Sequence, residues 1–216
     1  MIQAILFDLD GTLADTAADL GGALNRQLRR HGKNEVPLEQ VRSVATHGSA
    51  AFIRLGFGID GDSPDFETLR QEYLDEYRQN FCRDTVLFAG INPLLLELAE
   101  RGIKWGIVTN KHRQFTDNLV PALDFAVPPQ AVVSGDTCTE AKPSAMPLLY
   151  ACKLMNVEPE NCLYVGDAER DMQAAKNAGM RAVLAEWGYI AESDCVAEWG
   201  CDAAVATPDQ LLDCLV

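Results

Sequence analysis

Short apolar runs alternate with helical segments along most of the chain. The apolar runs end at polar residues or glycine, as expected for strands buried on both faces of a sheet, and they cover residues 2–7, 103–109, 131–134, 162–165 and 180–185. Helical periodicity appears at residues 17–30, 92–101, 172–178 and 208–215, and a further short strand is expected at 203–206. This alternation predicts an α/β fold, a doubly wound and mainly parallel Rossmann-like sheet with right-handed crossovers.

The segment between the first strand and residue 84 breaks the alternation. Residues 38–46, 49–55 and 66–81 have helical patterns separated by glycines and prolines, and no apolar run here is typical of a buried strand. We therefore expect an α/β core domain made of residues 1–15 and 85–216, and an inserted helical domain made of residues 16–84.

Two carboxylates follow the first predicted strand. Asp8 and Asp10 are two residues apart, so on an extended chain their side chains lie on the same side, and Gly11 then allows a tight turn. Ligands bind beyond the carboxyl ends of strands in open α/β sheets. Two close carboxylates repel unless a cation joins them, and Mg²⁺ is the ion that combines carboxylates with phosphate oxygens. An aspartate at such a place can also be the nucleophile that forms an aspartyl-phosphate.

Polar residues also follow later predicted strands. Thr109 and Asn110 end the second strand, where a hydroxyl and backbone N–H groups can donate to phosphate oxygens. Lys142 follows the third strand and supplies a compact cation that neutralises phosphate and holds an aspartate. Asp167 and Asp171 lie at the end of the fourth strand and in the next helical turn. That spacing directs one carboxylate to a metal and the other to its water shell or to Lys142.

These residues form four short motifs whose order resembles that of the haloacid dehalogenase (HAD) superfamily in its phosphatase form. The motifs are Asp8-Leu9-Asp10-Gly11-Thr12, Val108-Thr109-Asn110-Lys111, Lys142-Pro143 and Gly166-Asp167 with Asp171 four residues on. In that family the first aspartate, here Asp8, attacks phosphorus. The second, here Asp10, protonates the leaving alcohol and then activates water. Asp10 also argues against a dehalogenase, because dehalogenases lack this acid–base aspartate.

The resemblance implies roles for the remaining motif residues. Thr109, with Asn110 beside it, binds the transferring phosphoryl group, and Lys142 neutralises its charge. The implied catalytic residues are Asp8, Asp10, Thr109 and Lys142. The implied metal site for Mg²⁺ draws on Asp8, the backbone carbonyl of Asp10, Asp167 and Asp171. The implied function is a Mg²⁺-dependent phosphatase that hydrolyses a small phosphomonoester through an aspartyl-phosphate.

In the same superfamily a helical cap follows the first motif and closes over the active site, and residues 16–84 match that placement. We expect substrate-binding residues at the helix-breaking junction of residues 46–49, where His47 and Ser49 suit hydrogen bonding. Arg42 and Arg54 flank this junction and suit contact with an anion. A solvated corner between two helices is an equally good interpretation.

Two further stretches look most like the phosphoglycolate phosphatase group, which includes relatives acting on N-acetylmuramic acid 6-phosphate. They are Glu169-Arg170-Asp171 and Trp187-Gly188-Tyr189-Ile190. A small phosphorylated metabolite is therefore the expected partner. The alternatives are a phosphatase for N-acetylmuramic acid 6-phosphate or another sugar phosphate, a mutase of the β-phosphoglucomutase kind, and a non-catalytic phosphate-binding module.

Composition narrows the setting of this chemistry. The net charge of −14 over 216 residues opposes binding to nucleic acid or anionic membranes, and no basic run offsets it. No apolar segment is long enough to span a bilayer, and the first residues lack the regions of a signal peptide. The 7 cysteines include no Cys-x-x-Cys pair, which disfavours zinc and fits a reduced cytoplasm. We expect a cytoplasmic monomer or homodimer.

Overall fold

A parallel sheet of six strands forms the centre of the computed structural model, which describes residues 1–215. Its strand order is β5-β4-β1-β6-β7-β8. The strands are β1 (Ala4–Phe7), β4 (Lys104–Val108), β5 (Ala131–Val133), β6 (Cys162–Gly166), β7 (Arg181–Ala185) and β8 (Ala203–Val205). Phe7 of β1 pairs with Ile107 on one side and Val165 on the other, so β1 is central. The expected doubly wound parallel sheet is confirmed.

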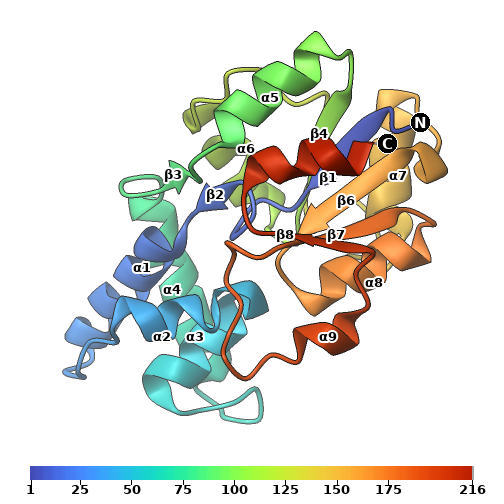
Figure 1. Ribbon diagram of the computed structural model, residues 1–216. Helices are drawn as coiled ribbons and strands as arrows, with labels where there is room; N and C mark the ends of the chain where they lie inside the picture. Colours follow the sequence, from blue (N-terminus) through green and yellow to red (C-terminus); the bar gives the residue numbers. More distant parts are fainter. Residues whose placement is uncertain (216) are drawn as a thin grey trace.

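Helices cover both faces of this sheet, because consecutive strand residues point to opposite faces (Figure 1). Ile5 and Phe7 face one hydrophobic cluster, and Ala4 and Leu6 face another. The first cluster includes side chains of α5 (Ile91–Glu100), α6 (Arg113–Ala122) and the 3₁₀ helix η3 (Pro208–Leu215). The second includes side chains of α7 (Met146–Met155), α8 (Glu169–Asn177) and α9 (Val196–Trp199), and the short 3₁₀ helix η2 (Pro159–Asn161) precedes β6.

Four helices lie together beside the sheet, where the sequence predicts an insertion (Figure 1). They are α1 (Ala17–Arg30), α2 (Leu38–Arg42), α3 (Gly48–Phe57) and α4 (Phe66–Asn80), with the 3₁₀ helix η1 (Ala45–His47) between α2 and α3. Their own hydrophobic cluster includes Phe52 and Tyr73, whose rings stack with centroids 5.2 Å apart. The domain bounds at residues 15/16 and 84/85 stay a prediction. No helix within residues 1–215 is long and apolar enough to cross a membrane.

Local features differ from the sequence prediction where short-range signals are weak. The helix expected over residues 38–46 is broken, because α2 ends at Arg42 and η1 follows it. The last helix, expected over residues 208–215, is of the 3₁₀ type. The sequence also missed an antiparallel pair of strands, β2 (Ala14–Asp15) and β3 (Val86–Leu87), which have two residues each and therefore no detectable period. This pair lies where the chain enters and leaves helices α1–α4.

Candidate active site

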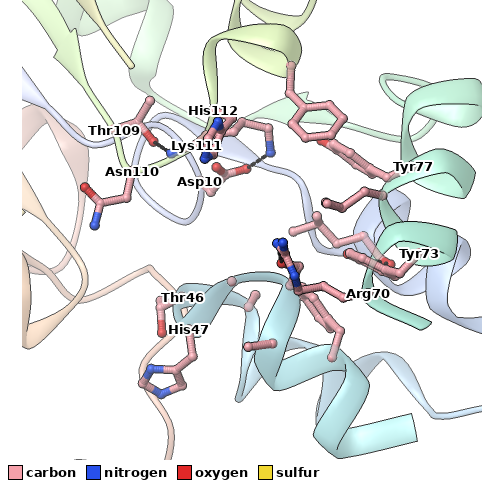
Figure 2. A pocket seen from close by; sticks show the side chains of 18 of the residues that line it. Asp10, Thr46, His47, Arg70, Tyr73, Tyr77, Thr109, Asn110, Lys111 and His112 are labelled. Carbon is pink, nitrogen blue, oxygen red and sulfur yellow. Dashed lines mark hydrogen bonds and ion pairs between the residues drawn. The ribbon is translucent and has the colours of Figure 1, made fainter. Parts of the chain in front are cut away.

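The carboxyl ends of three neighbouring strands bring the first motif residues together. Asp8 follows β1, Thr109 follows β4 and Asp167 follows β6, and β1 lies between the other two strands. Lys142 reaches the same place from the loop after β5. All four residues are buried, with no more than 4% of their surface exposed. A pocket of about 350 Å³ lies between these strand ends and helices α3 and α4 (Figure 2).

The ammonium group of Lys142 is the centre of a buried polar network. Its Nζ lies 3.0 Å from Oδ1 of Asp8 and 2.8 Å from Oδ1 of Asp171. It also donates to the Tyr164 hydroxyl at 2.7 Å and to the Val108 carbonyl at 3.0 Å. The predicted lysine thus contacts the first aspartate and the last one at once.

Asn110 holds the loop that carries this lysine. Its side-chain oxygen accepts from the backbone N–H of Lys142 at 3.0 Å, and its amide nitrogen donates to the backbone carbonyl of Lys142 at 2.9 Å. Asn110 also lines the pocket, but its amide is already engaged by the chain itself. Thr109 accepts from the backbone N–H of Lys111 at 3.2 Å, which leaves its hydroxyl proton free to donate into the pocket.

Asp8, Asp167 and Asp171 form the acidic cluster of the site. Each offers one carboxylate oxygen, and these three oxygens lie within 4.8 Å of one another. Asp167 is held from two sides, because the Thr12 hydroxyl donates to Oδ1 at 2.9 Å and the Tyr189 N–H donates to Oδ2 at 2.8 Å. All three donors are hard oxygen ligands in a closely spaced group, which fits a divalent cation such as Mg²⁺ or Ca²⁺.

The pKa shifts of the acidic cluster also favour a bound cation. Burial alone would raise the pKa of Asp8, but the nearby cations Lys142 and Arg170 outweigh it and lower that pKa. Burial, together with the charges of Asp8 and Asp171, raises the pKa of Asp167 to about 7. Three buried carboxylates therefore face two cationic side chains, and the excess negative charge is what a bound metal would offset.

Asp10 lies on the pocket wall and its carboxylate is not one of the three clustered ones. Its Oδ1 accepts from Nζ of Lys111 at 2.9 Å and from the Thr16 hydroxyl at 2.6 Å. Burial would lower the pKa of Lys111, but Asp10 and Tyr77 outweigh it, so this pKa is raised and Lys111 keeps its positive charge. Figure 2 shows the Asp10–Lys111 pair beside Thr109. The expected metal contact through the backbone carbonyl of Asp10 stays a prediction.

The structure places only some of the expected substrate-binding residues of the insertion at the pocket. His47 and Ser49 line the pocket, and His47 also borders a second, smaller one. Arg42 does not line the pocket. Its guanidinium pairs with the partly buried carboxylate of Asp15 at 2.5 Å and lies over the Tyr189 ring, 5.5 Å from the centroid. The placement of Arg42 therefore argues against the expected substrate contact.

Three basic residues of the pocket had no assigned role in the sequence analysis. Lys111 ends the second motif and Arg170 lies between Glu169 and Asp171, so both belong to stretches that carried the resemblance. Arg170 donates to the carbonyl of Thr46 and lies 3.9 Å from Oδ2 of Asp8. Arg70 of α4 gave no signal, because a basic residue three positions after an acid is common on a solvated helix.

Comparisons with known proteins agree with this geometry. The model of the haloacid dehalogenase-like hydrolase family matches residues 5–185. N-acetylmuramic acid 6-phosphate phosphatase of Pseudomonas aeruginosa is 36% identical, over 99% of this chain and 95% of its own length. Phosphoglycolate phosphatase of Xanthomonas campestris is 38% identical, over 97% of this chain and 94% of its own length.

A solved structure supports the fold. The crystal structure of a predicted phosphoglycolate phosphatase from Haemophilus somnus superposes with a TM-score of 0.86, covering 100% of this chain and 98% of that one, at 23% identity. The fold and the acidic cluster thus define an α/β protein with a parallel sheet and a site suited to a divalent metal. The chain belongs to the haloacid dehalogenase-like hydrolase family. Within that family its chemistry is that of a phosphoric monoester hydrolase.

Proposed function

We propose that this protein is a Mg²⁺-dependent phosphatase that hydrolyses a small phosphomonoester by way of an aspartyl-phosphate on Asp8. The observation that carries the proposal is Asp8 itself. Its carboxylate is 2% exposed, borders the pocket and has the Lys142 ammonium 3.0 Å away. The lowered pKa of Asp8 keeps it ionised, and the ionised form is the one that attacks phosphorus.

The groups around Asp8 suit the charge that develops during this attack. In our proposal the Lys142 ammonium and the Thr109 hydroxyl meet the equatorial oxygens of the transferring group. Arg170, with its Nη2 3.9 Å from Asp8, adds a second positive charge. Asn110 acts by holding the Lys142 loop, because its amide bonds both backbone groups of that residue.

The acidic cluster is the proposed metal site. Asp8 and Asp167 would hold Mg²⁺, with the backbone carbonyl of Asp10 and the Asp171 carboxylate near it. When bound, the ion draws charge from the phosphoryl oxygens and offsets the excess of carboxylates in the site. Thr12 and the Tyr189 N–H hold Asp167 in place, so its carboxylate is fixed before the ion arrives.

Asp10 is the proposed general acid and base. It gives a proton to the departing alcohol oxygen as Asp8 forms its bond to phosphorus. It then takes a proton from the water that attacks the phosphorus, which returns the Asp8 carboxylate and releases inorganic phosphate. Lys111 and Thr16 hold the Asp10 carboxylate at the pocket wall, 2.9 and 2.6 Å away.

We further propose that residues 16–84 form a cap over the core of residues 1–15 and 85–216. The pocket lies between side chains of α3 and α4 on one side and the strand ends on the other. Closure of such a cap excludes water from the aspartyl ester until the leaving alcohol has departed. A cytoplasmic location, a monomeric or homodimeric state, and the absence of nucleic-acid or membrane partners stay predictions.

Two candidate substrates follow from the relatives. 2-Phosphoglycolate is the first, and N-acetylmuramic acid 6-phosphate is the second, because relatives with both names align along nearly the whole chain. A mutase would use the same residues but return the phosphoryl group to a sugar. Net phosphate release separates a hydrolase from a mutase.

The test is phosphate release from both esters with Mg²⁺, by wild type and by Asp8→Asn. We expect Mg²⁺-dependent turnover by wild type, and none by a folded variant that still binds substrate. Near-normal turnover by Asp8→Asn would refute the proposed nucleophile. Isomer formation without net phosphate would favour the mutase, and inactivity of wild type on a broad panel of phosphomonoesters would favour a non-catalytic module.

A further inference from the structure

We propose that Arg70 binds a carboxylate on the leaving group, so that the substrates of this enzyme are phosphate esters of carboxylic acids. The inference rests on the proposed phosphatase function and adds the chemistry of the group that departs. Three observations support it. Arg70 lines the pocket away from the strand ends, some of its N–H groups have no close partner, and the other two cations of the pocket are bound to Asp10 or lie near Asp8.

Arg70 is a cation on the opposite side of the pocket from the strand ends. It lies on α4 and lines the same pocket as Asp8 and Asp10. Figure 2 shows its side chain reaching from α4 into the space between α3 and the Asp10–Lys111 pair. Among the described residues that line this pocket, it is the one arginine or lysine contributed by helices α1–α4.

The guanidinium of Arg70 keeps donors for a ligand. Its Nε and Nη2 bind Glu67 at 2.9 and 2.6 Å, which orients the group on one edge. The remaining amine, Nη1, lies 3.5 Å from Oγ of Ser49, at the limit of a hydrogen bond. Glu67 therefore occupies two of the five N–H donors of the Arg70 guanidinium at good hydrogen-bond distances. The open edge, with the Ser49 hydroxyl beside it, suits the two oxygens of a carboxylate.

The other pocket cations are engaged near the reacting end. Lys111 pairs with Asp10 at 2.9 Å, and Arg170 lies between Asp8 and the Thr46 carbonyl. The phosphoryl group therefore has its own positive charges, and Arg70 is left for a second anionic group. An anion that reaches Arg70 from the strand ends must belong to the leaving group.

The wall between these two ends is largely apolar. It includes the aromatic rings of Phe52, Tyr73, Tyr77 and Phe115. A leaving group with an uncharged body and a distal carboxylate matches this order of surfaces. The volume of about 350 Å³ leaves room for a body of sugar size.

Both candidate esters carry the required group. 2-Phosphoglycolate has its carboxylate next to the phosphate-bearing carbon, and N-acetylmuramic acid 6-phosphate has one on a lactyl ether, farther from the phosphate. The recognised chemistry is the same in both. The length of the leaving group distinguishes them, and the apolar wall favours the longer acid.

The experiment compares each acid with its uncharged amide. We would measure kcat and KM with Mg²⁺ for 2-phosphoglycolate, for N-acetylmuramic acid 6-phosphate and for the carboxamide of each, using wild type and Arg70→Gln. We expect Arg70→Gln to lower kcat/KM about 10- to 100-fold for the acid that wild type prefers, mainly through KM. The amide of that acid should change less than about threefold, and Arg70→Lys should restore part of the loss.

Arg29→Gln is the matched control. Arg29 lies on α1, pairs with an acid, Glu35, at 2.5 Å and does not line the pocket. The substitution removes the same charge from the same set of helices, so it reports any general effect of net charge. All four substrates should keep their wild-type kinetics with this variant.

The outcomes separate this proposal from the proposed function. Asp8-dependent turnover in which Arg70→Gln lowers kcat/KM equally for acid and amide, or for neither, overturns the carboxylate contact and leaves the phosphatase standing. A wild-type preference for the amides over the acids would also overturn the carboxylate contact and leave the phosphatase standing. Absence of Asp8-dependent turnover on all four esters overturns the carboxylate contact, and inactivity on the broad panel of phosphomonoesters as well overturns the proposed phosphatase function.

Discussion

Lys142 and Asp171 form an ion pair of 2.8 Å in which neither side chain is exposed to solvent. The same ammonium lies 3.0 Å from Asp8, so one cation joins the loop after β5 to the end of β1 and the first turn of α8. Asp171 also accepts from the backbone N–H of Ala168 at 3.0 Å. The ammonium that we propose stabilises the phosphoryl group therefore also joins three parts of the site.

Replacing this lysine should reduce stability as well as activity. Lys142→Met leaves the carboxylates of Asp8 and Asp171 buried without their cation, and breaking a buried pair in this way costs about 3–5 kcal/mol. We expect that loss in the free energy of unfolding by urea at pH 8 without metal, and no detectable phosphate release. The double variant Lys142→Met/Asp171→Asn should recover part of the stability but none of the activity. A single-variant loss below about 1 kcal/mol would contradict the pairing.

Arg170 should matter for turnover more than for folding. Its guanidinium donates to the Thr46 carbonyl and lies 3.9 Å from Asp8, so it joins α8 to η1 across the pocket. A lysine has one compact charge and cannot reach both partners in the same geometry. We expect Arg170→Lys to lower kcat about 10- to 100-fold, because the positive charge near the phosphoryl group is misplaced.

Steady-state kinetics and urea unfolding of the same Arg170→Lys preparation check this. The free energy of unfolding should stay within about 1 kcal/mol of wild type, since the positive charge remains. Wild-type kcat in a folded variant would show that Arg170 has no part in the reaction.

The site residues at strand ends were predictable because a short apolar run marks each strand and the parallel topology brings the strand ends together. Asp8, Thr109 and Asp167 each follow an apolar run, and a parallel sheet brings the carboxyl ends of neighbouring strands to one edge. No long-range information was needed beyond the expectation of a parallel sheet. The order of the motifs then supplied the roles that geometry alone leaves open.

Residues outside the strand ends were not predictable, because their partners come from distant parts of the chain. Arg42 flanks the junction of residues 46–49 in sequence, yet Asp15 binds it away from the pocket. Arg70 has the spacing of a surface ion pair with Glu67, and only the packing of α4 against α1 and α3 turns it toward the pocket. Sequence periodicity describes which face of a helix is apolar, but not which cation of the other face meets a ligand.

Gly188 lies against the proposed metal ligand Asp167 and is expected to tolerate a side chain poorly. A Cβ built there would lie 2.2 Å from Cβ of Asp167 and 2.7 Å from the carbonyl oxygen of Gly11, and neither partner is the end of a flexible chain. Gly188→Ala should cost about 3 kcal/mol of unfolding free energy and weaken Mg²⁺ binding, because Asp167 must move. Gly61→Ala is the control, since nothing lies within 4 Å of its Cβ and its effect should stay within about 0.5 kcal/mol. Equal urea midpoints for the two variants would contradict the close packing.

The raised pKa of Asp167 gives the metal-free protein a defined pH dependence. Burial and the charges of Asp8 and Asp171 move this pKa from 3.8 to about 7, so between these values the folded state holds a proton that the unfolded state has released. Stability from this group is therefore full below about pH 4 and is lost as pH rises towards 7. The largest loss is about 4 kcal/mol. Asp8 does not contribute in this window, because its pKa is lowered.

Urea unfolding of wild type and Asp167→Asn between pH 5 and pH 8 isolates the effect. Without metal, wild type should lose stability relative to Asp167→Asn as pH rises, because the asparagine stays uncharged. Mg²⁺ should restore wild type at pH 8, since the ion binds the ionised carboxylates of the folded state and unfolding must release it. The variant should respond much less, because a carboxylate of the acidic cluster is gone. If metal-free wild type and Asp167→Asn keep the same stability difference across this range, or if Mg²⁺ stabilises both equally, Asp167 is not the residue that couples protonation to metal binding.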